Sequence, residues 1–265
     1  MTTAIIGAGV MGETLLSGLL RAGVPKSELL IADRRIERSA EVTKEHGVAN
    51  GTNQEVSAKA DTVVLVVKPQ DMAIVLDEIK DSLRPGTLVV SLAAGITTGF
   101  MEDLLPAKTP VIRVMPNTPA LVDQGMAAIS SGTNSTDEHL VTVETLLRSV
   151  GQVVRVPEKY QDAVTAISGS GPAYIFYVVE AMIEGGVMLG LPRDVANELV
   201  LQTVYGAATM LRETNEHPTV LREQVTSPGG TTVAALRQFD DFKVRAAFLS
   251  AMEAARDRSK ELGMQ

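Results

Sequence analysis

The sequence contains no cysteine and no tryptophan, and aromatic residues make up only 3% of it. Without cysteine the chain can form no disulfide and can use no thiolate as a nucleophile. This absence agrees with a reducing compartment, and the first residues also lack the basic region and the apolar run of a secretory signal. We therefore expect a cytoplasmic protein.

Side chains suited to acid–base chemistry are scarce as well. The only histidines are His46, His139 and His217, and none has a neighbour in the sequence that would complete a catalytic triad. No lysine occurs between Tyr160 and Phe242. No group of His, Asp and Glu has the spacing of metal ligands, so we expect no metal site. This scarcity favours a substrate that brings its own proton: an imine whose C=N bond is protonated before it binds needs no strong acid from the protein.

The charge balance is acidic, with a formal net charge of −8. This argues against nucleic acid or an anionic membrane surface as a partner. The longest apolar helix candidate, residues 173–189, is interrupted by Glu180, Glu184 and two glycines, so we expect no membrane span. The 265 residues, 45% of them hydrophobic, are enough for two modest globular domains.

The first part of the chain alternates short apolar runs with helix-length stretches. Continuous β-branched runs in this arrangement are typical of strands that are buried on both faces of a parallel sheet. We predict a Rossmann-type α/β domain with a mostly parallel sheet over residues 1–157. The predicted strands are residues 4–6, 29–32, 62–67, 88–92, 111–115, 126–129 and 153–156.

The rest of the chain, residues 158–265, has no further strand-like run and is predicted to be all-helical. The stretch Ala173–Leu189 has 13 apolar residues among its 17, and Glu180 and Glu184 share one face. Its polar stripe is therefore narrow. Such a helix lies either at the centre of a monomer or in a bundle between subunits, and we favour the bundle because about 105 residues bury so apolar a helix poorly.

A glycine fingerprint, G-x-G-x-x-G, is formed by Gly7, Gly9 and Gly12 directly after a predicted strand and before a predicted helix. Gly7 allows the tight turn, Gly9 allows close approach of a pyrophosphate, and Gly12 allows the helix to pack on the strand. The helix N-terminus offers unpaired N–H groups to the phosphates. The pattern predicts a dinucleotide site, with a glycine-rich turn without a ligand as the alternative.

The end of the second predicted strand carries opposing signals about the cofactor. Asp33 follows Gly12 by 21 residues, where an acid binds the ribose 2′-hydroxyl of NAD. Arg34 and Arg35 follow at once, and a guanidinium there can bind the 2′-phosphate of NADP. The arginines could also simply neutralise Asp33 on a solvated face. We predict NADP, with NADPH preferred over NADH and NAD possible.

Other strand ends add to the predicted cofactor site, because ligands of open α/β sheets bind at the carboxyl ends of the strands. Asn53 and Lys68 fall at such ends, although a lysine at a strand end is as often a plain surface residue. The small residues after Leu92 would leave room for a nicotinamide ring. The cofactor residues predicted from these patterns are Gly7, Gly9, Gly12, Asp33, Arg34, Arg35, Asn53, Val66, Val67, Lys68, Pro69, Leu92, Ala93 and Ala94.

Several short stretches, in order along the whole chain, carry a resemblance to a known family. They are Ile6-Gly7-Ala8-Gly9 with Gly12, Val67-Lys68-Pro69, residues 91–95 (SLAAG), residues 113–119 (RVMPNTP), residues 168–173 (SGSGPA) and residues 227–232 (SPGGTT). On these stretches the sequence closely resembles the pyrroline-5-carboxylate reductase family, the last enzyme of proline synthesis. The last two are highly specific for that family, whereas the glycine fingerprint is not.

The resemblance implies NAD(P)H-dependent reduction of 1-pyrroline-5-carboxylate to L-proline. It also implies a helical domain that interlocks two subunits, and assembly of dimers up to decamers. The resemblance adds Ile6, Ala8, Val10 and Met11 to the expected cofactor contacts. The implied substrate contacts are Gly230, Thr231 and Thr232, with Ser227 and Gln224 close by. We predict Thr232 as the catalytic, substrate-orienting hydroxyl. The stretch 226–232 would present a helix N-terminus without ionisable groups, which suits the carboxylate of a five-membered imine.

The resemblance leaves some points open. Members of the family often have Gly or Glu two residues before the His-Pro pair, where this chain has Asn215, so we assign no role to Asn215 or Glu216. A reductase of the 3-hydroxyacid dehydrogenase type would use a helical lysine, which the lysine-free stretch disfavours. A non-catalytic dinucleotide sensor is disfavoured because cofactor and substrate stretches are both present.

Overall fold

The structure is a computed structural model that describes residues 1–263. It divides the chain into two compact units. The first comprises Met1–Ser170 together with the chain from Ala254 onward, and the second comprises Gly171–Glu253. The boundary that the sequence predicts after residue 157 stays a proposal for how the chain divides into domains.

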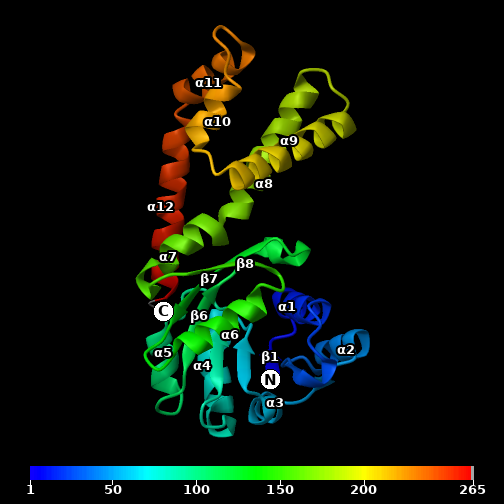
Figure 1. Cartoon of the computed structure of the whole chain (residues 1–265), viewed down its shortest axis with the longest axis vertical. Helices are drawn as coiled ribbons and strands as arrows, with labels where there is room; N and C mark the ends of the chain where they lie inside the picture. The colour runs from blue at the N-terminus through cyan, green and yellow to red at the C-terminus, as the bar shows by residue number, and fades with distance from the viewer. Residues whose placement is uncertain (264–265) are drawn as a thin grey trace. The chain divides into compact units, whose positions relative to one another are not determined.

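The first unit is built on an eight-stranded sheet with the order β3-β2-β1-β4-β5-β6-β7-β8 (Figure 1). Within residues 1–263 the only antiparallel pairing is that of β6 with β7, so the predicted mostly parallel Rossmann-type sheet is confirmed. The strands are β1 (Thr3–Ile6), β2 (Leu29–Ala32), β3 (Ala49–Asn50), β4 (Thr62–Leu65), β5 (Leu88–Ser91), β6 (Val111–Met115), β7 (Gly125–Ser131) and β8 (Gly151–Arg155).

The seven predicted strands are all present, and the eighth, β3, was missed. It has only two residues, both exposed, so it shows neither an apolar run nor an alternating pattern. It pairs with the edge of β2 through Leu30 and Ile31. The strand predicted over residues 62–67 ends earlier, at Leu65, and the chain then turns into the segment that carries Lys68.

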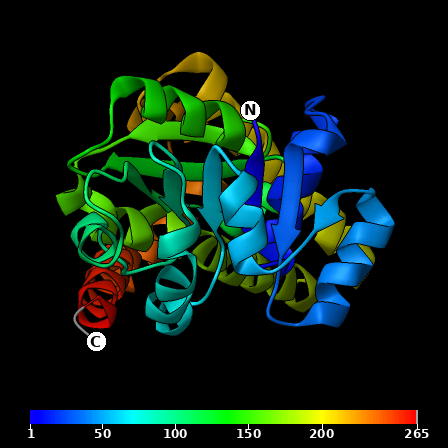
Figure 2. The same cartoon turned by 90° about the horizontal axis from the view of Figure 1, so that it is seen from below.

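Helices cover both faces of this sheet (Figure 2). Each face has its own apolar core. Successive strand residues point to opposite faces, so Ile5 belongs to one core while Ala4 and Ile6 belong to the other. Helices α1 (Val10–Arg21), α2 (Ile36–His46) and α6 (Asp137–Leu147) supply the first core; α3 (Asn53–Lys59), α4 (Met72–Ile79) and α5 (Thr98–Leu104) supply the second.

A buried arginine and its carboxylate partners connect β6, the segment after β8 and the last turns of the chain's final helix. Arg113 of β6 has a side chain only 5% exposed, and its guanidinium lies 3.4 Å from Glu158 and 4.0 Å from Asp162. Glu158 also accepts hydrogen bonds from the backbone N–H and the hydroxyl of Thr98, at 2.7 and 2.6 Å. Ser259, near the end of α12 (Val244–Leu262), donates to Asp162 at 2.8 Å. This bond attaches the last turns of α12 to the segment that follows β8.

The second unit is helical throughout, and the predicted helical region is confirmed. Helices α8 (Gly171–Met188) and α9 (Arg193–Thr214) pack against each other as a hairpin, and α10 (Pro218–Gln224), α11 (Thr231–Asp241) and the first part of α12 follow (Figure 1). A Cβ added at Gly186 would lie 3.0 Å from the Cβ of Ala196, so the glycine allows these two helices to come close.

Little of the apolar surface of this second unit is covered within one chain. Of its hydrophobic residues, which the structure describes in full, only Ala196 and Val200 are buried. Helix α8 has no buried residue at all. Phe176, Tyr177 and Met188 are 64, 75 and 85% exposed. Exposed apolar surface on this scale marks an interaction site.

Among the described residues, one helical run, Glu158–Met188, is long and apolar enough by length and composition to cross a membrane. Only 6% of its most apolar window is buried against the rest of the chain. Glu180 and Glu184 lie inside the run.

Candidate active site

The turn after β1 requires glycine at two of the fingerprint positions. Gly7 has a φ of +108°, and a Cβ there would lie 2.3 Å from the carbonyl oxygen of Val66. A Cβ on Gly12 would lie 1.9 Å from the carbonyl oxygen of Gly7. Any side chain at either position would therefore force the strand, the turn and α1 apart.

Gly9 differs from the other two glycines because it faces open space. A Cβ there would meet no atom within 4 Å, and its φ of −69° suits any residue. Gly9 is the N-cap of α1, where no side chain bonds to the first turn of the helix. The helix therefore presents its first N–H groups and its positive dipole end beside a bare stretch of backbone, which fits the pyrophosphate of a dinucleotide.

Two adjoining grooves run along this edge of the sheet, with volumes of about 270 and 570 Å³. They share Asp33, Arg34, Asn53, Asp71 and Val75. The predicted cofactor residues that line them are Ile6, Gly7, Gly9, Asp33, Arg34, Arg35, Asn53, Val66, Val67 and Lys68. A groove of this size, which begins at the glycine turn and passes the end of β2, can accommodate an extended dinucleotide.

The remaining predicted cofactor residues lie in the first unit but outside the lining of the two grooves. Met11 and Leu92 line a different, smaller cavity. In the part of the chain that the structure describes, neither groove is lined by Ala8, Val10, Gly12, Pro69, Ala93 or Ala94. Ala93 is 4% exposed, and its N–H donates to the hydroxyl of Ser91 at 3.2 Å.

Asp33 is already engaged by the protein. One carboxylate oxygen accepts the backbone N–H of Ala8 at 2.8 Å, and the other accepts the backbone N–H and Nε of Arg35 at 2.9 and 3.2 Å. Burial by itself raises the pKa of Asp33, but these donors outweigh it and hold the pKa below its usual value. Asp33 is therefore an anion at neutral pH that fastens the glycine turn to the end of β2.

Arg38, which sequence reasoning missed, binds the same residue, Ala8, at its carbonyl group. Its Nε donates to the carbonyl oxygen of Ala8 at 2.8 Å, and its guanidinium also bonds to Glu13 of α1. The signal in the sequence is weak, a third arginine a few residues after Asp33. The carboxylates of Glu13 and Glu45 and the ring of His46 gather within 4.8 Å, but Arg38 already supplies a cation to Glu13, and we assign no metal there.

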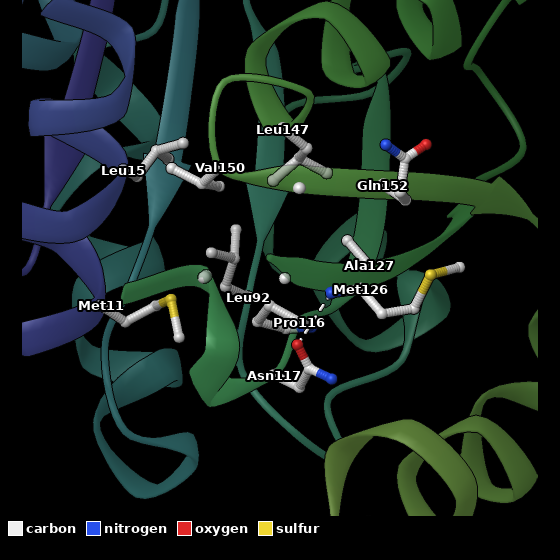
Figure 3. A pocket seen from close by; sticks show the side chains of 13 residues that line it. Met11, Leu15, Leu92, Pro116, Asn117, Met126, Ala127, Leu147, Val150 and Gln152 are labelled. Carbon is white, nitrogen blue, oxygen red and sulfur yellow. Dashed lines mark hydrogen bonds between the residues drawn. The ribbon is translucent and has the colours of Figure 1, made fainter. Parts of the chain in front are cut away.

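A small cavity of about 10 Å³ lies beside Met11, Leu92 and Asn117, with room for about one water molecule (Figure 3). The Oδ1 atom of Asn117 accepts the backbone N–H of Met126 at 2.8 Å, and its Nδ2 donates to the carbonyl oxygen of Ser168 at 3.0 Å. The side-chain amide thus joins two of the stretches singled out in the sequence, residues 113–119 and residues 168–173.

The predicted substrate stretch folds as a glycine turn that opens a helix. Gly229 has a φ of +68°, and the N–H of Gly230 donates to the carbonyl oxygen of Ser227 at 3.0 Å. Gly230 is the N-cap of α11, and no side chain caps that helix. The first N–H groups of α11, beginning at Thr231, are therefore available to an anion, as at α1.

The hydroxyls of this stretch are also available. Thr232 is half-buried, while Thr231 and Ser227 are exposed, and Gln224 is the last residue of α10. Across residues 1–263 no hydrogen bond engages the side-chain hydroxyl of Ser227, Thr231 or Thr232. Other threonines of this unit behave differently: Thr226, for example, donates to the carbonyl oxygen of Arg222 at 2.5 Å.

Two protein families match separate segments of the chain. Residues 2–95 match the family described as NADP oxidoreductase coenzyme F420-dependent. Residues 158–262 match the family described as pyrroline-5-carboxylate reductase dimerisation. The first segment contains the glycine turn, and the second contains the turn that opens α11.

Relatives that match the chain over almost its whole length carry the name of the second of these families. The pyrroline-5-carboxylate reductase of Corynebacterium melassecola is 46% identical over 266 residues, which cover 99% of this chain and 98% of the relative. A pyrroline-5-carboxylate reductase structure from Coxiella burnetii has a TM-score of 0.93 at 36% identity and covers 98% of both chains. The pyrroline carboxylate reductase of Plasmodium falciparum, solved with NADP bound, has a TM-score of 0.89 at 30% identity, covering 99% of this chain and 98% of that one.

Proposed function

Because the chain belongs to the pyrroline-5-carboxylate reductase family, we propose that it reduces the C=N bond of 1-pyrroline-5-carboxylate to L-proline, the last step of proline biosynthesis. The observation that carries this function is the likeness over 99% of the chain at 46% identity. The chain is an oxidoreductase of NADP, and the residues assigned below are the part of the function that we propose from its geometry.

The cofactor binds along the two grooves that begin at the glycine turn. Gly9 and the N-terminus of α1 hold the pyrophosphate, since the space beside Gly9 is open and the helix there has no capping side chain. Asp33 and the arginines beside it face the adenosine ribose. When bound, the reduced cofactor supplies a hydride from C4 of its nicotinamide.

The substrate carboxylate binds at the N-terminus of α11. Gly230 and Thr231 contribute backbone N–H groups, and the hydroxyl of Thr232 orients the ring, with Ser227 and Gln224 nearby. The support for this assignment is the uncapped helix and the unpaired hydroxyls of this stretch. A helix N-terminus binds a carboxylate without a charged side chain, which agrees with the lack of ionisable groups in residues 226–232.

The proton of the reaction arrives with the substrate. The ring nitrogen of the imine is protonated before binding, the ring carbon of the C=N bond then accepts the hydride, and the product is the secondary amine of L-proline. The chain's own residues need only orient the ring and exclude water, since reduction of an iminium carbon requires no strong acid. The absence of lysine between Tyr160 and Phe242 supports a reaction in which the substrate, and not the protein, supplies the proton.

The chain forms a homo-oligomer, and we propose a homodimer made by the C-terminal helices, with larger assemblies up to a decamer. The exposed apolar surface of α8 supports this, because a second copy of the same helix would cover it. We propose that the apolar run Glu158–Met188 does not span a membrane, because Glu180 and Glu184 would then face lipid. We place the enzyme in the cytoplasm.

The test of the function is an assay of the purified chain. Incubation with NADPH and 1-pyrroline-5-carboxylate should deplete the nicotinamide absorbance band and yield L-proline in equal amount, detected by chromatography. A reaction without substrate controls for cofactor decay. If a correctly folded, oligomeric sample oxidises no NADPH and forms no proline, the proposed activity is wrong.

A further inference from the structure

The adenosine end of the cofactor grooves holds two arginines, and each is already paired with a carboxylate. Arg35 lies 3.2 Å from Asp33, and Arg34 lies 3.4 Å from both carboxylate oxygens of Asp71. Asp71 lies on the short turn Pro69–Asp71, between β4 and α4. The pairing therefore joins the segment that follows β2 to the segment that follows β4.

The two pairs differ in how firmly they are held. Asp33 has a side chain 8% exposed and also accepts the N–H of Ala8, so its pair is part of the glycine turn. The side chains of Arg34 and Asp71 are 74 and 27% exposed, and within the described chain each has only the other as an ionic partner. An exposed pair of this kind is weak, so Arg34 can exchange one anionic partner for another.

The charges at this end of the grooves cancel. This balance holds for the two pairs, Asp33 with Arg35 and Asp71 with Arg34; Lys68 adds a positive charge to the narrower groove, and Glu55 and Glu78 add two negative charges to the wider one. A ribose 2′-phosphate brings a charge of about −1.5 to −2, comparable with that of any phosphate monoester at neutral pH. To gain a guanidinium as partner, it competes with the carboxylates that already hold Arg34 and Arg35, whereas a 2′-hydroxyl needs no such exchange.

We propose that Asp71 is a specificity-determining residue for the cofactor: it holds the Arg34 guanidinium that a 2′-phosphate would otherwise take, and so keeps NADH usable beside NADPH. The proposal rests on the proposed binding of a nicotinamide dinucleotide in these grooves. It separates two roles, since Asp33 positions the glycine turn for either cofactor while Asp71 sets the balance between them.

Calorimetry with two adenosine fragments tests this without the catalytic reaction. The probes are adenosine 2′,5′-bisphosphate, which carries the 2′-phosphate, and adenosine 5′-monophosphate, which does not. In Asp71→Asn, at low ionic strength, the bisphosphate should bind about fivefold more tightly, the size expected for an exposed charge pair, and the monophosphate should be unchanged within about twofold. The ratio of KM for NADPH to KM for NADH should fall by a similar factor.

Two further variants identify the partner. Arg34→Gln should weaken the binding of the bisphosphate. Adding Asp71→Asn to this variant should not change the affinity further, because the arginine that Asp71 restrains is then missing. Glu78→Gln is the matched control: Glu78 lines the same groove and bonds to Asn53 at 2.7 Å, not to an arginine, so its loss of charge should leave the ratio unchanged.

The outcomes separate the inference from the function. The role of Asp71 would be overturned if Asp71→Asn tightened the binding of both fragments equally or had no effect on either. It would also be overturned if the tighter binding of the bisphosphate persisted in the absence of Arg34. None of these results would contradict the enzyme's activity. Failure of the unmodified protein to bind either fragment or either cofactor would instead contradict the proposed cofactor site itself.

Discussion

The two compact units of this chain handle apolar surface in opposite ways. The sheet unit closes two cores within a single chain, and side chains such as Ile5, Leu16 and Met72 are completely buried there. The helical unit buries only Ala196 and Val200 among its hydrophobic residues. Both units are rich in regular secondary structure, so regular secondary structure alone does not mean that a unit has completed its own core.

The difference follows from the elements themselves. A parallel sheet with helices on both faces encloses its strands, and each buried Leu or Ile contributes about 1.5–3 kcal/mol. A hairpin of two helices covers only one stripe of each, so α8 and α9 leave most of their apolar residues outside. The sheet unit is expected to be insensitive to oligomeric state, and the helical unit to depend on it.

A charge placed on α8 should have the largest effect on the protein. In Phe176→Glu each copy loses about 2 kcal/mol of apolar burial, and two-fold symmetry repeats the loss, so we expect dimerisation to weaken by about 1,000-fold. Light scattering should then report the mass of a single chain at micromolar concentration, and activity should fall with it.

The control for that variant carries the same charge on the sheet unit. Val141 of α6 is 48% exposed, and Val141→Glu should leave the mass unchanged, since that side chain lies on a unit whose cores are already closed. The comparison between the units would break if both variants dissociated the protein equally, or if the unmodified chain were a stable monomer.

Two glycines of one turn should separate folding from binding. Gly12→Ala places a Cβ 1.9 Å from a carbonyl oxygen, so we expect a loss of about 3 kcal/mol and a Tm lower by about 6–12 °C. Gly9→Ala meets no atom, so its Tm should be unchanged while nucleotide affinity falls at least about tenfold. Thermal unfolding and calorimetry on both variants check this; a Gly9→Ala protein that binds NADPH normally would remove Gly9 from the site.

The buried cation of the sheet unit gives a smaller effect. Arg113→Ala leaves Glu158 and Asp162 without their guanidinium; since Glu158 is 27% exposed, we expect a loss of about 2 kcal/mol, below the range for a fully buried pair. Thermal unfolding should show a Tm lower by about 4–8 °C, with the mass unchanged. The exposed pair of Arg84 and Asp61 is the control, and Arg84→Ala should cost less than about 1 kcal/mol. Equal losses in the two variants would contradict this account.

The smallest expected effect concerns a single hydroxyl. Thr232→Ala should lower kcat/KM about tenfold, the loss of one hydrogen bond of about 1.4 kcal/mol in the transition state, with the mass and Tm unchanged. Thr145→Ala is matched to it, because the hydroxyl of Thr145 is used within α6, where it donates to the carbonyl oxygen of Val141 at 2.8 Å. Unaltered kinetics in Thr232→Ala would remove that residue from the substrate site.

Much of the fold could be predicted from the sequence because the strands of the sheet unit and the helices of the second unit each leave a strong hydrophobic pattern. Strands buried on two faces appear as continuous apolar runs, and the helical region appears as long stretches without such runs. The two-residue strand β3 was beyond reach, because it is exposed and too short to show a period. Its existence depends on the neighbouring edge of β2, which only the folded sheet provides.

The candidate site was only partly predictable for a different reason. Spacing places Asp33 at the end of β2, but it says nothing about which donors occupy its carboxylate, and here the N–H of Ala8 is one of them. Arg38, Asp71 and Asn117 each have a partner that is 30 to 51 residues away in sequence. Contacts of that range depend on the packed sheet and leave no local pattern.

The path of the chain has a consequence for how this protein can be cut and recombined. The chain leaves the sheet unit at Ser170 and re-enters it at Ala254, and near its end a Cβ on Gly95 would lie 3.2 Å from the N atom of Gly263. The helical unit is thus inserted within the chain of the sheet unit, and two chain connections, not one, join the two units. A chimera that exchanges helical units between relatives must match both connections, and a stop codon after residue 157 would remove a piece of the sheet unit along with the helices.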